Sequence, residues 1–184
     1  MRNFDCVIIG AGHAGAEAAH ACARLGADTL LITISKDSIA KMSCNPAIGG
    51  LAKGQIVREI DALGGIMAKA TDVAGIQFRM LNRSKGPAVQ SPRAQTDKYE
   101  YKDCIRQILE DTPNLEIVEA IASDIIVNDG KVSAVKCLDG KSYNCKTVIV
   151  TTGTFLKGIM HTGTTQWPGG RSEEQTSELQ SPNT

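Results

Sequence analysis

Three groups of residues in this chain have the types and spacing that chemistry requires. The first is the glycine-rich sequence G-A-G-H-A-G from Gly10 to Gly15, and the second is Cys44 in the sequence S-C-N-P. The third is the segment Gln77–Arg93, which holds four cationic side chains and no acidic one. Residues of these kinds cradle phosphates, attack electrophilic carbons and bind anions, respectively.

The glycine-rich sequence has the G-x-G-x-x-G spacing of a dinucleotide-binding turn. An apolar segment, Phe4–Ile9, comes before it, and a helical pattern, Ala14–Leu25, comes after it. In such a turn Gly10 allows a tight bend, Gly12 lets the backbone approach a pyrophosphate, and Gly15 lets helix and strand pack closely. The sequence therefore predicts a dinucleotide at the helix N-terminus, bound by Gly10, Ala11, Gly12, His13, Ala14 and Gly15.

His13 lies inside this turn, where an imidazolium would oppose the positive end of the helix dipole. We expect it to pack or to lie beside a phosphate rather than to act as an acid or a base. The acidic residue that usually binds a ribose at the end of the second strand is absent, because Thr33 stands there. The choice between FAD and NAD therefore cannot rest on that position.

The elements around the turn predict a doubly wound, Rossmann-like α/β domain. A second buried strand at Thr29–Thr33 completes a βαβ unit with the first strand and the helix. A further helix is expected at Thr96–Asp111 and a third parallel strand at Leu115–Glu119. Between them, residues 34–92 contain scattered glycines, which predict irregular loops and short helices such as Gln55–Leu63.

A β-meander is predicted next, from short alternating segments that N-D-G and D-G turns separate: Ile125–Val127, Val132–Lys136 and Ser142–Asn144. It leads into an apolar strand, Thr147–Thr151, that ends in T-T-G. This crossover resembles the two-dinucleotide-binding flavoproteins, in which the pattern marks an FAD-binding domain. NAD dehydrogenases usually continue with further βα units, so the resemblance favours FAD.

Six further blocks resemble the glucose-inhibited division protein A family: M-S-C-N-P-A-I-G-G (42–50), D-A-L-G-G (61–65), G-I-Q-F-R (75–79), N-R-S-K-G-P-A-V (82–89), P-R-A-Q-T-D (92–97) and G-T-F-L-K-G (153–158). The resemblance covers Asp5 to about Gly170. Members of this family are flavoprotein subunits of an enzyme that makes 5-carboxymethylaminomethyluridine in tRNA.

The resemblance implies an FAD-dependent reaction that adds an aminomethyl or carboxymethylaminomethyl group to carbon 5 of a wobble uridine. Methylenetetrahydrofolate would donate the one-carbon unit, glycine or ammonium the nitrogen, and NADH the electrons that reduce FAD. The implied partners are tRNA and a tRNA-modifying GTPase subunit, with this protein as a homodimer within a heterotetramer. Ala122 would contact the adenine side of FAD through its backbone.

Cys44 matches a cysteine that is proposed to be catalytic in this family. A thiolate could add to carbon 6 of uracil and make carbon 5 nucleophilic. The alternative is a small buried thiol that shapes the loop near Pro46, since a lone cysteine is usually inert.

Cationic residues are concentrated in the middle of the chain. Between Lys41 and Arg106 there are 11 lysines and arginines against 6 acidic residues. An RNA-binding surface needs such an excess, because phosphate contacts supply most of the affinity. The alternatives are a solvated face or side chains that hold FAD phosphates. The candidate RNA-binding residues are Arg79, Arg83, Lys85 and Arg93.

Composition adds few constraints. The net charge is zero, no apolar stretch is long enough to span a bilayer, and the six cysteines show no C-x-x-C spacing. We therefore expect a cytoplasmic chain with reduced thiols, no membrane segment and no metal site.

The expected domains are the amino-terminal portion of an FAD-binding domain, residues 1–170, and a polar, disordered tail, residues 171–184, unrelated to the family. The flavin site would then be incomplete.

Two other functions stay open. One is the folate- and FAD-dependent uridine methyltransferase of the tRNA T-loop, which S-C-N-P-A-I-G-G argues against. The other is an inactive, truncated fragment that only binds nucleotide or RNA.

Overall fold

A computed structural model describes residues 2–43, 45–154, 156 and 159–168. The chain divides into two compact units, Met1–Thr151 and Thr152–Thr184. Cys44 and the predicted tail, 171–184, lie outside the described residues, so the expectations for them stay predictions.

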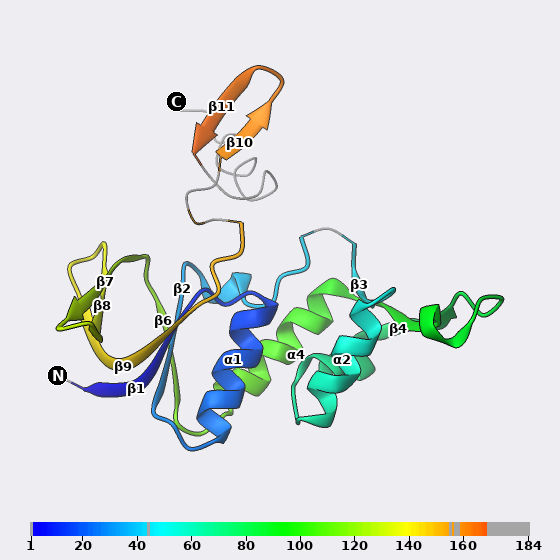
Figure 1. Cartoon of the computed structure of the whole chain (residues 1–184), viewed down its shortest axis with the longest axis horizontal. Helices are drawn as coiled ribbons and strands as arrows, with labels where there is room; N and C mark the ends of the chain where they lie inside the picture. The colour runs from blue at the N-terminus through cyan, green and yellow to red at the C-terminus, as the bar shows by residue number, and fades with distance from the viewer. Residues whose placement is uncertain (1, 44, 155, 157–158, 169–184) are drawn as a thin grey trace. The chain divides into compact units, whose positions relative to one another are not determined.

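The larger unit contains a six-stranded sheet in the order β6-β2-β1-β9-β8-β7 (Figure 1). Strands β6, β2, β1 and β9 run parallel to one another, and β8 and β7 continue the sheet in antiparallel fashion. The bounds of the strands, in chain order, are β1 Asn3–Ile9, β2 Thr29–Thr33, β6 Leu115–Glu119, β7 Ala122–Asn128, β8 Lys131–Cys137 and β9 Ser142–Val150.

Two apolar clusters cover the two faces of this sheet. One cluster joins the sheet to helices α1 (His13–Arg24) and α4 (Lys98–Glu110). In the other cluster the buried residues come from strands, including Val135 of β8 and Cys145 of β9. The prediction of an α/β fold with a parallel sheet is confirmed. The meander contributes Val135, Cys137 and Cys145 to the strand cluster.

Helix α1 forms where the sequence is rich in alanine, and small residues let it lie close to the sheet. Ala16, Ala19 and Ala23 are buried and recur at helical spacing on the side toward the sheet. Gly26 follows the helix with φ +90°, and its N–H donates to the carbonyl of Ala23. This left-handed conformation ends the helix directly after the predicted pattern, Ala14–Leu25.

Strand β9 corrects one prediction, because the third meander strand and the following apolar strand are a single strand. Its first residues pair with β8, as Ser142 does with Lys136, while its continuation pairs with β1, as Val148 does with Val7. One strand thus changes partner along its length. The polar sequence N-C-K lies in the middle of this strand. It does not interrupt the strand, because Lys146 is exposed and forms an ion pair with Asp5 at 2.6 Å.

Between β2 and α4 lies an inserted region that was predicted to be irregular loops and short helices. That prediction is wrong for much of it. Two short helices are present, α2 (Lys53–Ala62) and α3 (Met67–Ala74), but a three-stranded antiparallel sheet accompanies them. Its order is β3-β5-β4, with β3 at Ala47–Gly49, β4 at Gly75–Leu81 and β5 at Ser91–Thr96. Short 3-10 turns occur at Lys36–Ser38 and Pro87–Val89.

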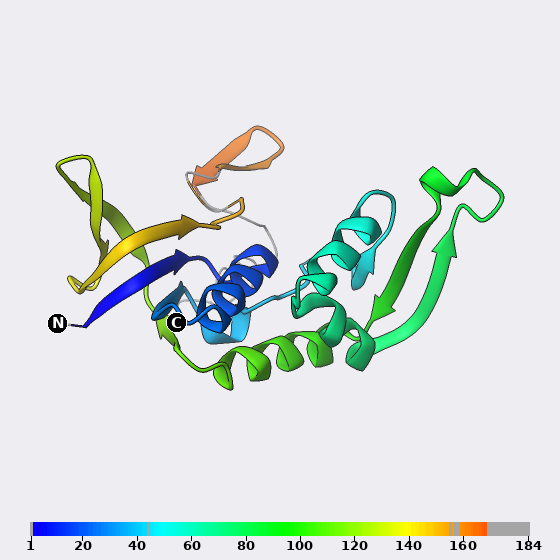
Figure 2. The same cartoon turned by 60° about the horizontal axis from the view of Figure 1, so that its bottom comes forward.

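Strands β4 and β5 with the loop between them, residues 75–96, form a long hairpin that we call the arm (Figure 2). The sequence did not reveal it because β4 has no alternation of buried and exposed residues. Ile76 and Phe78 are exposed although they are apolar. Pro92 also interrupts the pattern of β5, since proline disfavours a strand interior.

Helix α4 follows the arm and begins at a side-chain cap. Asp97 Oδ1 accepts hydrogen bonds from the backbone N–H groups of Tyr99 at 2.8 Å and Glu100 at 3.0 Å. The predicted helix at 96–111 is confirmed to within two residues at each end.

The smaller unit contains a two-stranded antiparallel hairpin, β10 (Ile159–Thr162) and β11 (Thr165–Pro168). Across the described part of the chain, no helix is long and apolar enough to cross a membrane. The same residues include no group of three or more His, Cys, Asp or Glu side chains that could hold a metal ion.

Candidate functional site

The glycine turn connects the end of β1 to the start of α1. Gly10 has φ +99°, a left-handed conformation that favours glycine, and its N–H donates to the carbonyl of Ile32 at 2.9 Å. Gly12 is the N-cap residue of α1, and no side chain caps the helix. The first turn of α1 also contains no acidic residue. Backbone N–H groups at this helix start can therefore receive an anionic ligand.

The other two glycines differ in the space around them. A Cβ at Gly15 would overlap the carbonyl oxygen of Gly10 and lie 2.8 Å from Thr151 Oγ1. A Cβ at Gly12 would meet no atom within 4 Å. Gly15 thus permits close packing of helix and strand, while Gly12 borders open space. This is the geometry predicted for a pyrophosphate cradle; binding itself stays a prediction.

Thr151, at the carboxyl end of β9, ties that strand to the turn. Its Oγ1 donates to the carbonyl of Gly10 at 2.8 Å, and its backbone N–H donates to that of Ile9 at 2.9 Å. Strand β1 has β2 on one side and β9 on the other, so the chain order changes direction here. Ligands of open α/β sheets bind at such a switch point, beyond the carboxyl ends of the strands.

The region expected to hold a ribose contains two hydrogen-bonded side chains. Thr33 is buried, and its hydroxyl donates to the carbonyl of Ser35 at 3.1 Å. Glu119, at the end of β6, accepts a hydrogen bond from the backbone N–H of Lys36 at 2.7 Å. An acidic residue therefore stands at the carboxyl end of β6, a position that sequence spacing alone did not indicate.

Ala122 is the first residue of β7 and is half-buried against the strand cluster. Two residues earlier, the N–H of Ala120 donates to the carbonyl of Thr33. The chain before Ala122 is thus joined to the end of β2, at the same edge as the glycine turn. Its contact with adenine stays a prediction.

His13 is half-buried. Its ring lies 5.7 Å from that of Tyr101 on α4, in an edge-to-face arrangement at 69°. Tyr101 is fully buried, and its hydroxyl has no hydrogen-bond partner among the described residues. Burial raises the pKa of Tyr101, and the nearby Glu17 carboxylate raises it further. The glycine turn thus packs against α4 through the His13–Tyr101 ring contact.

Helix α1 also holds the inserted region through two charged side chains. The Arg24 guanidinium donates to the carbonyls of Leu63 at 2.6 Å and Gly64 at 2.7 Å, where α2 ends. The Glu17 carboxylate accepts from the N–H of Met67 at 2.7 Å and of Ile66 at 3.0 Å, where α3 begins. Each charge suits the helix end that it meets. The sequence contained no signal for these contacts, which join residues 39 to 50 positions apart.

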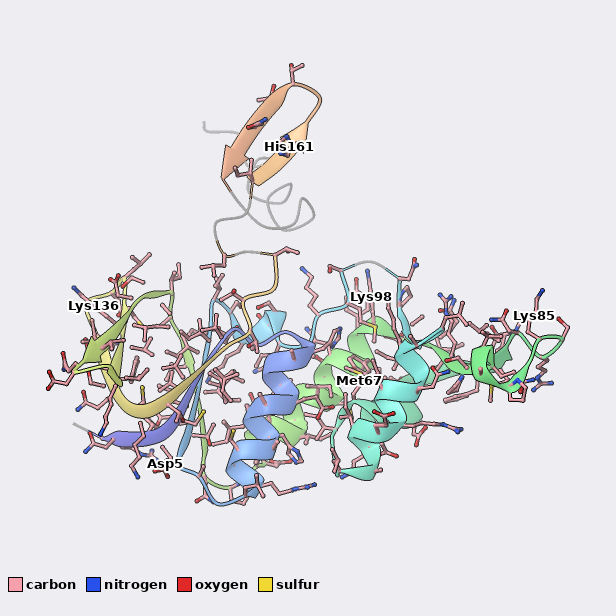
Figure 3. The ribbon with its side chains drawn as sticks, viewed as in Figure 1. Asp5, Met67, Lys85, Lys98, Lys136 and His161 are labelled. Carbon is pink, nitrogen blue, oxygen red and sulfur yellow. The ribbon has the colours of Figure 1, made fainter. Side chains whose placement is uncertain are left out.

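The four predicted RNA-binding cations all lie on the arm. Arg79 and Arg93 are direct partners across β4 and β5. Arg83 and Lys85 are exposed in the loop at the end of the arm, where Figure 3 places Lys85. In the part of the chain that the structure describes, none of the four forms an ion pair or a side-chain hydrogen bond.

Five cysteines are described, and all five are free thiols. Burial raises the pKa of Cys6 to about 11 and also raises the pKa of Cys137 and Cys145. A thiol with a raised pKa carries little thiolate, so these residues are poor nucleophiles. This agrees with the prediction of inert thiols, while the reactivity of Cys44 stays a prediction.

The sequence matches the family described as glucose inhibited division protein A over residues 5–183. The tRNA uridine 5-carboxymethylaminomethyl modification enzyme MnmG of Thermodesulfovibrio yellowstonii is 57% identical over 173 residues, covering 94% of this chain and 28% of that protein. Aquifex aeolicus GidA has a similar structure, with a TM-score of 0.88 and 54% identity over 92% of this chain and 28% of that chain. The chain thus spans about 28% of the length of these relatives.

The flavin-dependent brominase Bmp2 is a more distant likeness. Its TM-score is 0.58 and its identity 22%, over 85% of this chain and 40% of that chain, so the likeness concerns the fold alone. The family match, by contrast, covers nearly the whole chain: the protein belongs to the glucose inhibited division protein A family.

Proposed function

We propose that this chain carries the amino-terminal part of the FAD-binding domain of an enzyme that modifies the wobble uridine of tRNA. The observation that carries the proposal is the glycine turn, which is packed tight at Gly15 and open at Gly12. The identity to MnmG, whose name states a modification of tRNA uridine, supports the tRNA part of the proposal. The fold shared with a flavin-dependent enzyme and the strand crossover support the choice of FAD.

The residues at the turn fit a dinucleotide. The backbone N–H groups at the start of α1 would bind the pyrophosphate, and the open side of Gly12 would admit it. Gly10, Ala11, His13, Ala14 and Gly15 shape this cradle, and Ala122 would lie at the adenine side. When bound, FAD supplies redox chemistry that no side chain provides.

The complete reaction needs further components. In this proposal methylenetetrahydrofolate donates the one-carbon unit, glycine or ammonium provides the nitrogen, and NADH reduces the flavin. A GTPase subunit completes the complex, in which this protein is a homodimer. The reduced thiols support a cytoplasmic location.

Cys44 is the proposed nucleophile. Its thiolate would add to carbon 6 of uracil, and carbon 5 would then attack the one-carbon unit. Loss of the proton from carbon 5 would expel the thiolate and restore the double bond. This assignment rests on the resemblance of the block M-S-C-N-P-A-I-G-G (42–50) to the family.

The arm is the proposed RNA-binding surface. Its four cations lack acidic partners in the described structure, and a phosphate backbone would provide them. Lys85 lies at the end of the arm (Figure 3), and Arg83 is exposed in the same loop.

The test uses the complete protein that carries this chain. It is incubated with unmodified tRNA, FAD, NADH, methylenetetrahydrofolate, glycine and the GTPase subunit, and the digested nucleosides are weighed by mass spectrometry. We expect a carboxymethylaminomethyl group on the wobble uridine. A methyl group on a T-loop uridine would instead identify the methyltransferase. Unmodified tRNA would indicate a protein that only binds nucleotide or RNA.

Two cysteine variants test the nucleophile. Cys44→Ser should lower single-turnover modification by orders of magnitude while FAD content and tRNA affinity stay nearly unchanged. Cys104→Ser, at a half-buried thiol on α4, is the matched control and should modify tRNA normally. Normal turnover in Cys44→Ser would make that residue a structural thiol.

A further inference from the structure

We propose that Arg79 and Arg93 together form a clamp for one phosphodiester phosphate of the RNA, separate from the cations at the end of the arm. This inference rests on the proposed function and deepens it. It assigns to the two arginines one shared ligand instead of two independent contacts.

The register of the arm places the two guanidinium groups together. Arg79 on β4 is the direct partner of Arg93 on β5, so both side chains leave the same face of the hairpin. Side chains in such positions have Cβ atoms about 4.5–5.5 Å apart, and like charges directly opposite destabilise a sheet. On the other side of Arg93 the partner is Gly49 of β3, which brings no side chain to the row.

Nothing in the described structure offsets this repulsion. The arm contains no acidic residue from Gln77 to Arg93, and neither arginine donates a side-chain hydrogen bond. The neighbouring pair on the same face, Gln77 and Gln95, is neutral. By contrast, Arg2 and Arg106 each form ion pairs with carboxylates. The two opposed guanidinium groups thus present many N–H donors and a double positive charge to an external anion.

A phosphate matches these donors in shape and charge. Guanidinium groups bind phosphate oxygens through paired N–H donors, and two of them can share one phosphate. The FAD pyrophosphate is assigned to the glycine turn at the end of β1, on the other sheet of this unit. An RNA phosphodiester is therefore the ligand that fits the clamp.

The cations at the end of the arm form a separate group. Arg83 comes four positions after Arg79, and β4 ends at Leu81, so Arg83 lies beyond the paired strand in the loop at the end of the arm. The end loop has its own support: the side-chain amide of Asn82 donates to the carbonyl of Val89 at 3.0 Å, and that of Gln90 donates to the carbonyl of Lys85 at 3.1 Å. Arg83 and Lys85 are thus held away from the clamp.

The experiment measures binding of an unmodified tRNA transcript to the complete protein as salt increases, by fluorescence anisotropy. Arg79→Gln and Arg93→Gln should each reduce the slope of log K against log salt by about 0.7–0.9, one phosphate contact. The double variant should reduce it no further, because either substitution already removes the one phosphate contact that needs both guanidinium groups. Arg83→Gln combined with Arg79→Gln should reduce it by twice that amount.

Thermal unfolding without RNA gives a second readout. Each single clamp variant should raise Tm by about 1–3 °C, since one substitution removes the repulsion between like charges. The matched control is Lys136→Gln, at an exposed cation on β8 that has no ion pair in the described structure. Figure 3 shows Lys136 on the meander, away from the arm, and this variant should change neither Tm nor slope.

Additive losses of slope in the double clamp variant would overturn the shared phosphate. An unchanged slope together with loss of bound flavin would assign the arginines to FAD, which refutes the clamp and leaves the proposed function intact. Failure of the unaltered protein to bind tRNA would instead refute the proposed function itself. Flavin content is therefore measured by absorbance in every preparation.

Discussion

The glycine turn makes a prediction in which two similar substitutions fail for different reasons. At Gly15 an added Cβ overlaps the backbone of Gly10 and crowds Thr151, so α1 has to move away from β1. Overpacking of this kind typically costs 1–3 kcal/mol, and rigid backbone on the far side favours the upper part of that range. Alanine in a helix recovers about 1 kcal/mol relative to glycine. We therefore expect Gly15→Ala to lower the free energy of unfolding by about 2 kcal/mol.

Gly12→Ala should leave stability nearly unchanged. Gly12 has φ −67°, and its Cβ would enter open space, so alanine fits without strain. The reduced freedom of the unfolded chain stabilises the variant by about 0.4–1 kcal/mol. Alanine is a poorer N-cap than glycine, which offsets a similar amount. The new methyl group would, however, occupy the space where a pyrophosphate has to approach, so FAD retention should fall steeply.

Urea unfolding, monitored by circular dichroism, measures the free energy of unfolding. FAD absorbance after gel filtration measures FAD retention on the same samples. Gly86→Ala on the arm is the matched control, because its Cβ also meets open space and it lies away from the turn. That variant should keep both stability and flavin. Full flavin retention in Gly12→Ala, or wild-type stability in Gly15→Ala, would refute the assignment of roles to the two glycines.

Three further predictions concern the elements that position the turn. Glu17→Ala removes the acceptor for the Ile66 and Met67 N–H groups. It should lower the free energy of unfolding by about 1–2 kcal/mol. Faster hydrogen exchange of these two amides should report the loss, and unchanged exchange would contradict it. Tyr101→Phe should be neutral or stabilising by up to about 1 kcal/mol, since it deletes a buried hydroxyl that has no partner among the described residues; a clear loss in urea unfolding would show that the hydroxyl is bonded. The pKa of Asp97 is lowered, chiefly by hydrogen bonds from backbone N–H groups at the start of α4. Its carboxylate therefore stabilises the fold above the unfolded pKa of about 3.9. This contribution is lost as the pH falls through the lower folded pKa. Asp97→Asn should therefore differ from the wild type in unfolding midpoint at pH 7 and differ less at pH 2, and an equal difference at both pH values would argue against the cap.

The sequence by itself determined the features that depend on neighbours along the chain. The strand, glycine turn and helix of the βαβ unit could be predicted because their signals lie within about thirty residues. The helix expected at 96–111 corresponds to α4, and α1 ends where the predicted pattern Ala14–Leu25 meets Gly26. The resemblance to the family also came from short blocks of sequence, and the family match confirms it.

Tertiary structure decided the features that depend on pairing between distant segments. Thr151 meets the glycine turn from about 140 positions away, and Glu17 reaches α3 across 50 positions. The sequence showed four cations on one segment, but only the register of β4 and β5 places Arg79 opposite Arg93. A shift of one residue would turn one side chain to the other face, because successive side chains of a strand alternate between faces. Such contacts are set by the path of the whole chain, which local patterns do not contain.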